Sequence, residues 1–87
     1  MLGKIIKKKR KALLISSIGL GELIEVSGTY ILLIEKGRLP TEEILKKIIV
    51  ALKFNSKETE EIYSLYDDEK LSDRVKEKIS KLENKTR

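Results

Sequence analysis

The sequence is most distinctive for the residues that it lacks. It has no cysteine, no histidine and no tryptophan, and it has one proline among 87 residues. Without cysteine there can be no disulfide, no thiolate metal ligand and no thiol nucleophile. Without histidine the commonest general base and metal ligand is missing, together with any Ser-His-Asp triad. We therefore expect a protein that is not an enzyme and that holds neither a metal nor a cofactor.

Long apolar runs are also missing near the basic segment 4–11. Only four apolar residues, Ala12 to Ile15, separate this segment from Ser16. A signal sequence needs an apolar run of about 7–15 residues, and a membrane-spanning helix needs about 18 or more. The sequence therefore predicts a cytoplasmic protein with no membrane partner. Its length is that of one small domain with a modest core.

Excess positive charge is confined to the first part of the chain. Residues 1–40 carry eight basic and three acidic side chains, whereas residues 41–87 carry eleven of each. The formal net charge of +5 therefore belongs entirely to the first part. A localised basic surface attracts polyanions such as nucleic acid, but a run of lysines is equally compatible with a merely solvated helix face.

Apolar residues recur at helical spacing along nearly the whole chain, and no segment alternates as a strand would. The pattern predicts helices over about 2–13, 17–25, 30–36, 41–52, 56–66 and 72–82, followed by a frayed tail. Serine, threonine or asparagine precedes most of these segments and can cap them. Asp67 and Asp68 are expected to end the fifth helix, and Ser72 to cap a sixth. The predicted fold class is all-α, a compact bundle of five to six short helices.

The segment 20–37 carries the most informative pattern. Gly21 supplies a small residue where two helix backbones can approach closely, and apolar residues from both helices can converge behind the turn. These apolar residues are Leu20, Ile24, Val26, Ile31 and Ile34. The spacing indicates a helix-turn-helix, although any two short helices of a bundle would fit it equally well.

Residues 2–52 resemble the lambda-repressor-like, Cro/XRE-type helix-turn-helix DNA-binding domain. The resemblance rests on the Tyr-Ile-x-x-Ile-Glu-x-Gly stretch that ends at Gly37, on Leu39-Pro40-Thr41, and on the apolar helix that follows. It implies a bundle of about five helices whose third helix enters the DNA major groove. It also implies a partly buried, structural ion pair between Arg10 and Glu35. The implied function is DNA binding in transcriptional control, as in phage repressors.

Several positions depart from the family pattern. The turn after the second helix usually carries glycine and here carries Glu25, which predicts a non-glycine residue in a left-handed conformation. The second helix usually begins with a polar residue, often glutamine, and here the matching residue is Ser17. The DNA-facing positions of the third helix hold Gly28, Thr29, Leu32 and Leu33. None of these four residues can form the bidentate contacts that read guanine or adenine.

The resemblance and the charge pattern together predict a set of DNA contacts. Basic side chains of the first helix, Lys4 among them, and of the segment after the third helix are expected on phosphates. The segment Ser27 to Leu33 is expected to face the major groove. The predicted DNA-binding residues are Ser17, Ser27, Gly28, Thr29, Tyr30, Leu32, Leu33, Lys36, Arg38, Lys7, Lys8 and Lys11.

Leu32 and Leu33 leave three interpretations open: core residues, contacts to thymine methyl groups, or an exposed patch that binds a protein. The third defines an alternative function, an antitoxin-like or adaptor module with weak or no specific DNA binding.

We divide the chain into a helix-turn-helix domain, 1–66, and a C-terminal helix with a frayed tail, 67–87. The stripe Leu71, Val75, Ile79 and Leu82 suits packing or dimerisation. The expected partners are double-stranded DNA, a second copy of the chain and, in the alternative, another protein.

Overall fold

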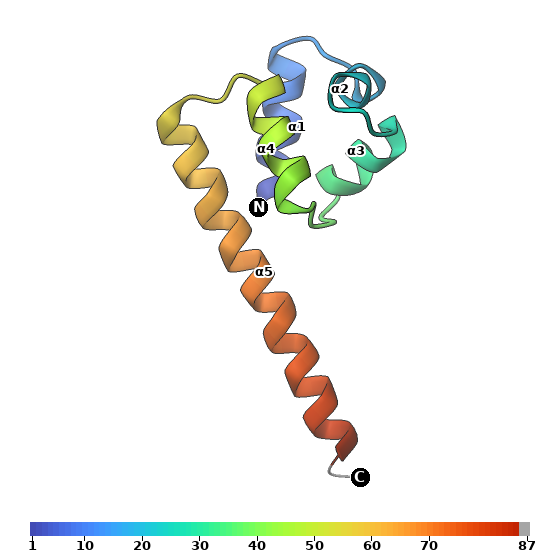
Figure 1. Cartoon of the computed structure of the whole chain (residues 1–87), viewed down its shortest axis with the longest axis vertical. Coiled ribbons are helices and arrows are strands. Elements are labelled where there is room, and N and C mark those ends of the chain that lie inside the picture. Colours follow the sequence, from blue (N-terminus) through green and yellow to red (C-terminus); the bar gives the residue numbers. More distant parts are fainter. Residues whose placement is uncertain (86–87) are drawn as a thin grey trace.

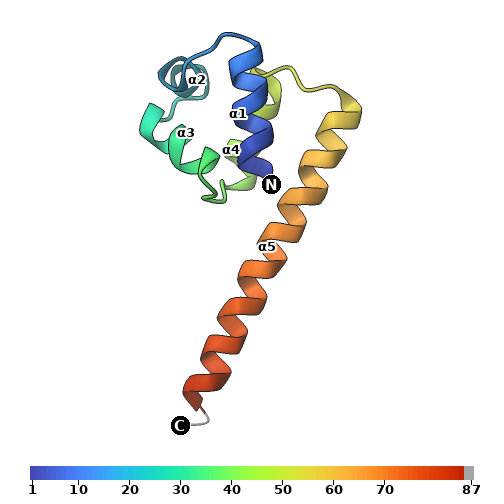
Figure 2. The same cartoon turned by 180° about the vertical axis from the view of Figure 1, so that it is seen from behind.

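The computed structural model describes the backbone of residues 1–85 and the side chains of residues 1–71. Within these limits the chain forms five helices and no strand: α1 (Leu2–Ala12), α2 (Ser17–Ile24), α3 (Gly28–Glu35), α4 (Glu42–Ala51) and α5 (Ser56–Lys85). Helices α1 to α4 form a compact bundle, and α5 starts beside it and then projects away from it (Figures 1 and 2). The predicted all-α bundle is confirmed.

Side-chain caps set the start of each helix from α2 to α4. The hydroxyls of Ser16, Ser27 and Thr41 accept hydrogen bonds from backbone N–H groups three residues ahead, at 2.9, 3.1 and 3.3 Å. Each cap satisfies an N–H that has no partner within the helix, which stabilises the helix by about 1 kcal/mol. Asn55 and Glu58 form a reciprocal capping box at the start of α5. The predicted starts of α2, α4 and α5 are confirmed, whereas α3 begins at Gly28, two residues earlier than predicted, because Ser27 caps it.

The predicted break after the fifth helix is wrong, because α5 runs without interruption from Ser56 to Lys85. Acidic residues are unfavourable at a helix C-terminus, but Asp67 and Asp68 lie in the interior of this helix, where that penalty does not apply. The stretch also contains no glycine or proline to end a helix. The described residues therefore form five helices, the lower end of the predicted range of five to six.

Buried side chains and hydrogen bonds hold the first half of α5 on the bundle. Ile62 and Tyr66 are buried in the core. The Tyr66 hydroxyl donates a hydrogen bond to the Pro40 carbonyl at 2.9 Å, and the Leu2 N–H donates to the Glu69 carboxylate at 3.1 Å. Beyond these contacts Leu71 is exposed. Val75, Ile79, Leu82 and the predicted tail lie outside the residues whose side chains the structure describes.

One core connects all five helices. It contains four of the five residues predicted to converge behind the turn, Leu20, Ile24, Ile31 and Ile34, and the fifth, Val26, packs half-buried at its edge. The other members are Leu2, Ile6, Leu45, Ile48, Ile49, Leu52, Ile62 and Tyr66. The expected convergence of apolar residues behind the turn is therefore confirmed.

Candidate nucleic-acid interface

Helices α2 and α3 form a tight corner. The chain direction turns by 110° between them, within the range of about 90–120° that is typical of a helix-turn-helix. A Cβ atom at Gly21 would overlap the carbonyl oxygen of Val26 and lie 3.1 Å from the nitrogen of Gly28. Only glycine allows the backbone to approach this closely, so the predicted role of Gly21 is confirmed.

Glu25 closes the corner in a left-handed conformation, with φ 62° and ψ 41°. Its N–H and that of Val26 both donate to the carbonyl of Gly21. A side chain in this conformation costs roughly 1–2 kcal/mol, and glycine avoids most of that cost. The prediction that Glu25 occupies a glycine-type position is confirmed.

Helix α3 has one buried side and one exposed side. Ile31, Ile34 and Glu35 face the interior. Leu32 and Leu33 retain 42% and 39% of their surface in contact with solvent, and Thr29 is also exposed. The interpretation of Leu32 and Leu33 as core residues is therefore wrong, because the two side chains lie at the surface.

Ile18 of α2 extends the exposed side of α3. It is 65% exposed, and a Cβ atom at Gly28 would lie only 2.9 Å from its Cγ1 atom. Leu32 and Leu33 follow one helical turn after Gly28 and Thr29, so these residues share one surface. We refer to Ile18, Gly28, Thr29, Leu32 and Leu33 as the apolar recognition face.

Ile18 was not among the predicted site residues, although its position in the sequence carried a signal. Ile18 lies two residues before Leu20 and six before Ile24, and both of these are buried. That spacing places Ile18 away from the buried side of α2. The exposure of Ile18 could therefore be predicted, because this apolar residue does not share the spacing of the buried residues of α2.

The polar residues predicted to touch DNA differ in their surroundings. Ser27 is exposed and Ser17 half-buried. The oxygen of Ser27 accepts the cap bond from Tyr30, which leaves the hydroxyl hydrogen available for another acceptor. Tyr30 packs half-buried against the core, with the Arg38 guanidinium 5.4 Å from its ring centroid. Arg38 and Lys36 are exposed just after α3.

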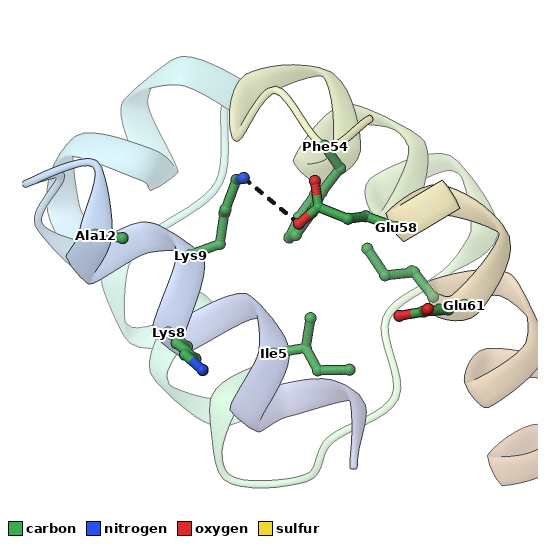
Figure 3. A pocket seen from close by; sticks show the side chains of 8 residues that line it. Ile5, Lys8, Lys9, Ala12, Phe54, Glu58 and Glu61 are labelled. Carbon is green, nitrogen blue, oxygen red and sulfur yellow. Dashed lines mark hydrogen bonds and ion pairs between the residues drawn. The ribbon is translucent and has the colours of Figure 1, made fainter. Parts of the chain in front are cut away.

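The basic side chains of α1 are divided between two sides of the helix. Lys4, Lys7 and Lys11 form an exposed stripe. A Cβ atom at Gly3 would lie 2.6 Å from carbonyl oxygens of α3, so α1 meets α3 along the side of Gly3. Lys7 follows Gly3 by one helical turn, which places the stripe next to α3. Lys8 instead lines a groove beside α5 (Figure 3).

The groove between α1 and α5 has a volume of about 300 Å³ and carries charges of both signs. Lys8 and Lys9 lie on one side of it, and Glu58 and Glu61 lie on the other (Figure 3). The Lys9 ammonium is 3.5 Å from the Glu58 carboxylate and 5.4 Å from the centroid of the Phe54 ring. Because these charges balance, the groove offers no clear site for a polyanion.

Arg10 and Glu35 form a buried ion pair between α1 and the end of α3. The Arg10 Nε and Nη2 atoms donate to the two carboxylate oxygens at 2.7 and 3.0 Å, and Nη1 donates to the Ile15 carbonyl at 2.9 Å. The hydrogen bond to Glu35 raises the pKa of Arg10 above its ordinary value, although burial opposes this effect. Arg10 is therefore a charged, structural residue.

The described part of the chain contains no other assembly that suggests a chemical site. No group of three or more acidic side chains is placed to hold a metal ion there. No single helix in that part has the length and apolar content to cross a membrane. The α2–α3 surface and the basic residues near it are therefore the candidate site.

Comparison with known proteins agrees with this geometry. A family model described as helix-turn-helix matches residues 6–58, which is more than half of the chain. Neither the curated proteins nor the solved structures gave a match. The matched range includes the Arg10–Glu35 pair and the whole α2–α3 corner. The chain therefore belongs to the helix-turn-helix family in its lambda-repressor-like, Cro/XRE-type form, a family of DNA-binding transcription regulators.

Proposed function

We propose that this domain binds double-stranded DNA with α3 in the major groove. The observation that carries the proposal is that the N-termini of α2 and α3 lie next to each other. The Cα and nitrogen atoms of Ile18 lie 3.1 and 3.2 Å from the position that a Cβ atom at Gly28 would occupy. Helices α2 and α3 therefore begin side by side. The first N–H groups of each helix have no acceptor within the helix, and the helix dipole is positive there, which favours phosphate.

Basic side chains near this point supply further phosphate contacts. Lys36 and Arg38 follow α3 directly, and the exposed stripe of Lys4, Lys7 and Lys11 lies along α1 where that helix meets α3. We leave Lys8 out of this set because it lines the groove beside α5. Such contacts hold the protein on DNA without reading its sequence.

The projecting part of α5 supports a dimer in this proposal. Leu71 is 61% exposed, two residues beyond Glu69, which is hydrogen-bonded to Leu2 of the bundle. In the sequence, Val75, Ile79 and Leu82 continue its apolar spacing. Pairing of this stripe with a second copy would provide two recognition helices for half-sites one DNA turn, about 34 Å, apart. Residues 67–87 would then form the dimerisation segment.

A second candidate function is a protein-interaction module. The exposed apolar side chains of Ile18, Leu32 and Leu33 favour it, and so does Leu14, which is 94% exposed with φ 57°. Continuous apolar surface often marks a protein contact. In that case, Leu32→Ser would weaken binding to a protein partner and leave the affinity for DNA unchanged.

Fluorescence anisotropy tests the proposed DNA binding. The protein is titrated against a duplex from upstream of its own gene and against a scrambled duplex, at several salt concentrations. Binding should weaken with salt, and the double variant Lys36→Gln/Arg38→Gln should flatten the slope of log K against log salt by about 1.8, or about 0.9 per phosphate contact. Lys57→Gln, an exposed change in the first turn of α5, is the control. No binding to either duplex, or an unchanged slope, would contradict the proposal.

A further inference from the structure

The apolar recognition face has almost no means of reading a base by hydrogen bonds. Bidentate reading of guanine or adenine needs Arg, Lys, Asn or Gln, and none of these is among Ile18, Gly28, Thr29, Leu32 and Leu33. The Thr29 hydroxyl is the one side-chain group of this face that forms hydrogen bonds. A surface of this kind selects DNA by a different property of the major groove.

The major groove presents one apolar group, the C5 methyl group of thymine. Ile18, Leu32 and Leu33 keep 65%, 42% and 39% of their surfaces exposed, so each has apolar surface to bury against a methyl group. Gly28 adds no side chain beside Ile18, and its missing Cβ leaves the backbone at the start of α3 open to close approach. The apolar side chains of this face can therefore bury their surface against the methyl groups of the DNA major groove.

We infer that this face selects DNA by the C5 methyl groups of its pyrimidines, with thymine as the main ligand and 5-methylcytosine as an equivalent one. The inference rests on the proposed DNA binding and specifies what α3 reads in the groove. Burial of one methyl group corresponds to roughly a fourfold gain in affinity. A site with two or three methyl contacts then prefers methylated pyrimidines by about tenfold or more.

Replacing thymine with uracil tests this inference directly. The substitution removes only the methyl group and keeps every phosphate and every hydrogen-bonding edge. Anisotropy compares a duplex of about 24 alternating dA and dT residues per strand with the same duplex containing dU. We expect binding to the uracil duplex to be weaker by about tenfold or more, with an unchanged salt slope. In a mixed G·C duplex, replacing cytosine with 5-methylcytosine should strengthen binding by a similar factor.

Protein variants identify the side chains that read the methyl groups. Leu32→Ser and Leu33→Ser should each bring the thymine-to-uracil affinity ratio toward one without changing the salt slope. Leu23→Ser is the matched control, since Leu23 is an exposed leucine that lines the groove between α2 and α4, outside the apolar recognition face. A ratio that stays unchanged in both α3 variants would overturn the assignment to these leucines.

Two results separate this inference from the proposed function. Equal affinity for the thymine and uracil duplexes, with the normal salt slope, would overturn methyl reading and leave DNA binding intact. No binding to either duplex would overturn both.

Discussion

Arg10 of α1 donates two hydrogen bonds to Glu35 at the end of α3, across 25 residues of sequence. A third bond from Arg10 to the Ile15 carbonyl adds the loop that leads into α2. Both charged residues are buried, with exposed fractions of 7% and 6%. One arginine therefore joins the first helix, the start of the helix-turn-helix and the recognition helix.

Breaking this pair should be costly. Arg10→Met or Glu35→Met should each lower the free energy of unfolding by about 3–5 kcal/mol, because each leaves a buried charge without its partner. The double variant Arg10→Met/Glu35→Met should lose much less than the sum of the two single losses. Urea denaturation measures these differences. Lys9→Gln breaks the more exposed pair with Glu58 and should cost about 1 kcal/mol or less. Equal losses for the buried and exposed pairs would contradict the structural role of Arg10.

The two glycines of α2 should respond differently to the same substitution. Gly21→Ala places a methyl group against the backbone of Val26 and Gly28, so it should destabilise the fold by about 2 kcal/mol. Gly19→Ala should be close to neutral, since a gain in helix propensity of about 1 kcal/mol offsets a small shift of the Ser16 hydroxyl, 3.1 Å from the new Cβ. Thermal unfolding of both variants provides the comparison. Similar melting temperatures would show that the α2–α3 corner has room for a side chain at position 21.

Glycine at position 25 should stabilise the domain. Glu25→Gly relieves the left-handed strain, and the greater freedom of glycine in the unfolded chain cancels part of that gain. We expect a net gain of about 0.5 kcal/mol in the free energy of unfolding. Glu25→Gln removes the same charge but keeps the strain, so it should give no such gain. A stabilisation by both variants would identify charge, and not conformation, as the cause.

Deprotonation of Tyr66 should lower the free energy of unfolding at alkaline pH. Burial raises the pKa of its hydroxyl above the ordinary value, and the carboxylates of Glu42 and Asp67 raise it further. The unfolded chain then loses this proton first, so the stabilisation is complete below about pH 10 and falls as the pH rises toward the folded pKa. Tyr66→Phe should cost about 1–2 kcal/mol at neutral pH, because the Pro40 carbonyl loses its donor.

The difference in unfolding free energy between wild type and Tyr66→Phe should therefore shrink above about pH 10. Tyr63→Phe is the control, because it removes a hydroxyl from a half-buried tyrosine one turn earlier on α5. A difference that stays constant from neutral to alkaline pH would show that the Tyr66 hydroxyl does not contribute this dependence.

Local chemistry made much of the fold predictable. Ser16, Ser27 and Thr41 cap helices through N–H groups only three residues away, so the signal lies within one turn of sequence. The apolar spacing of Leu20, Ile24, Ile31 and Ile34 likewise gave the buried side of the helix-turn-helix. Such features depend on neighbours in sequence more than on distant segments.

Among the contacts between distant segments, the family resemblance predicted the Arg10–Glu35 pair, but those of α5 were not predictable. The continuity of α5 depends partly on Tyr66 and Glu69, whose hydrogen-bond partners lie 26 and 67 residues away. Lys8 and Lys11 belong to the same basic run, yet only the position of α5 determines that Lys8 lines a groove. The sequence also did not determine whether Leu32 and Leu33 are exposed, because α3 is apolar on more than one side.

The most direct test of the central claim is an NMR titration of the ¹⁵N-labelled full chain with duplex DNA. If α3 enters the major groove, the largest amide shifts should occur at Ser17, Gly28, Thr29 and Leu32, with further shifts at Lys36 and Arg38. The amides of a second groove, between α2 and α4 and lined by Leu23 and Val50, should stay unchanged. Shifts confined to that groove or to α5, or no shifts at all, would contradict the assignment of α3 as the DNA-reading helix.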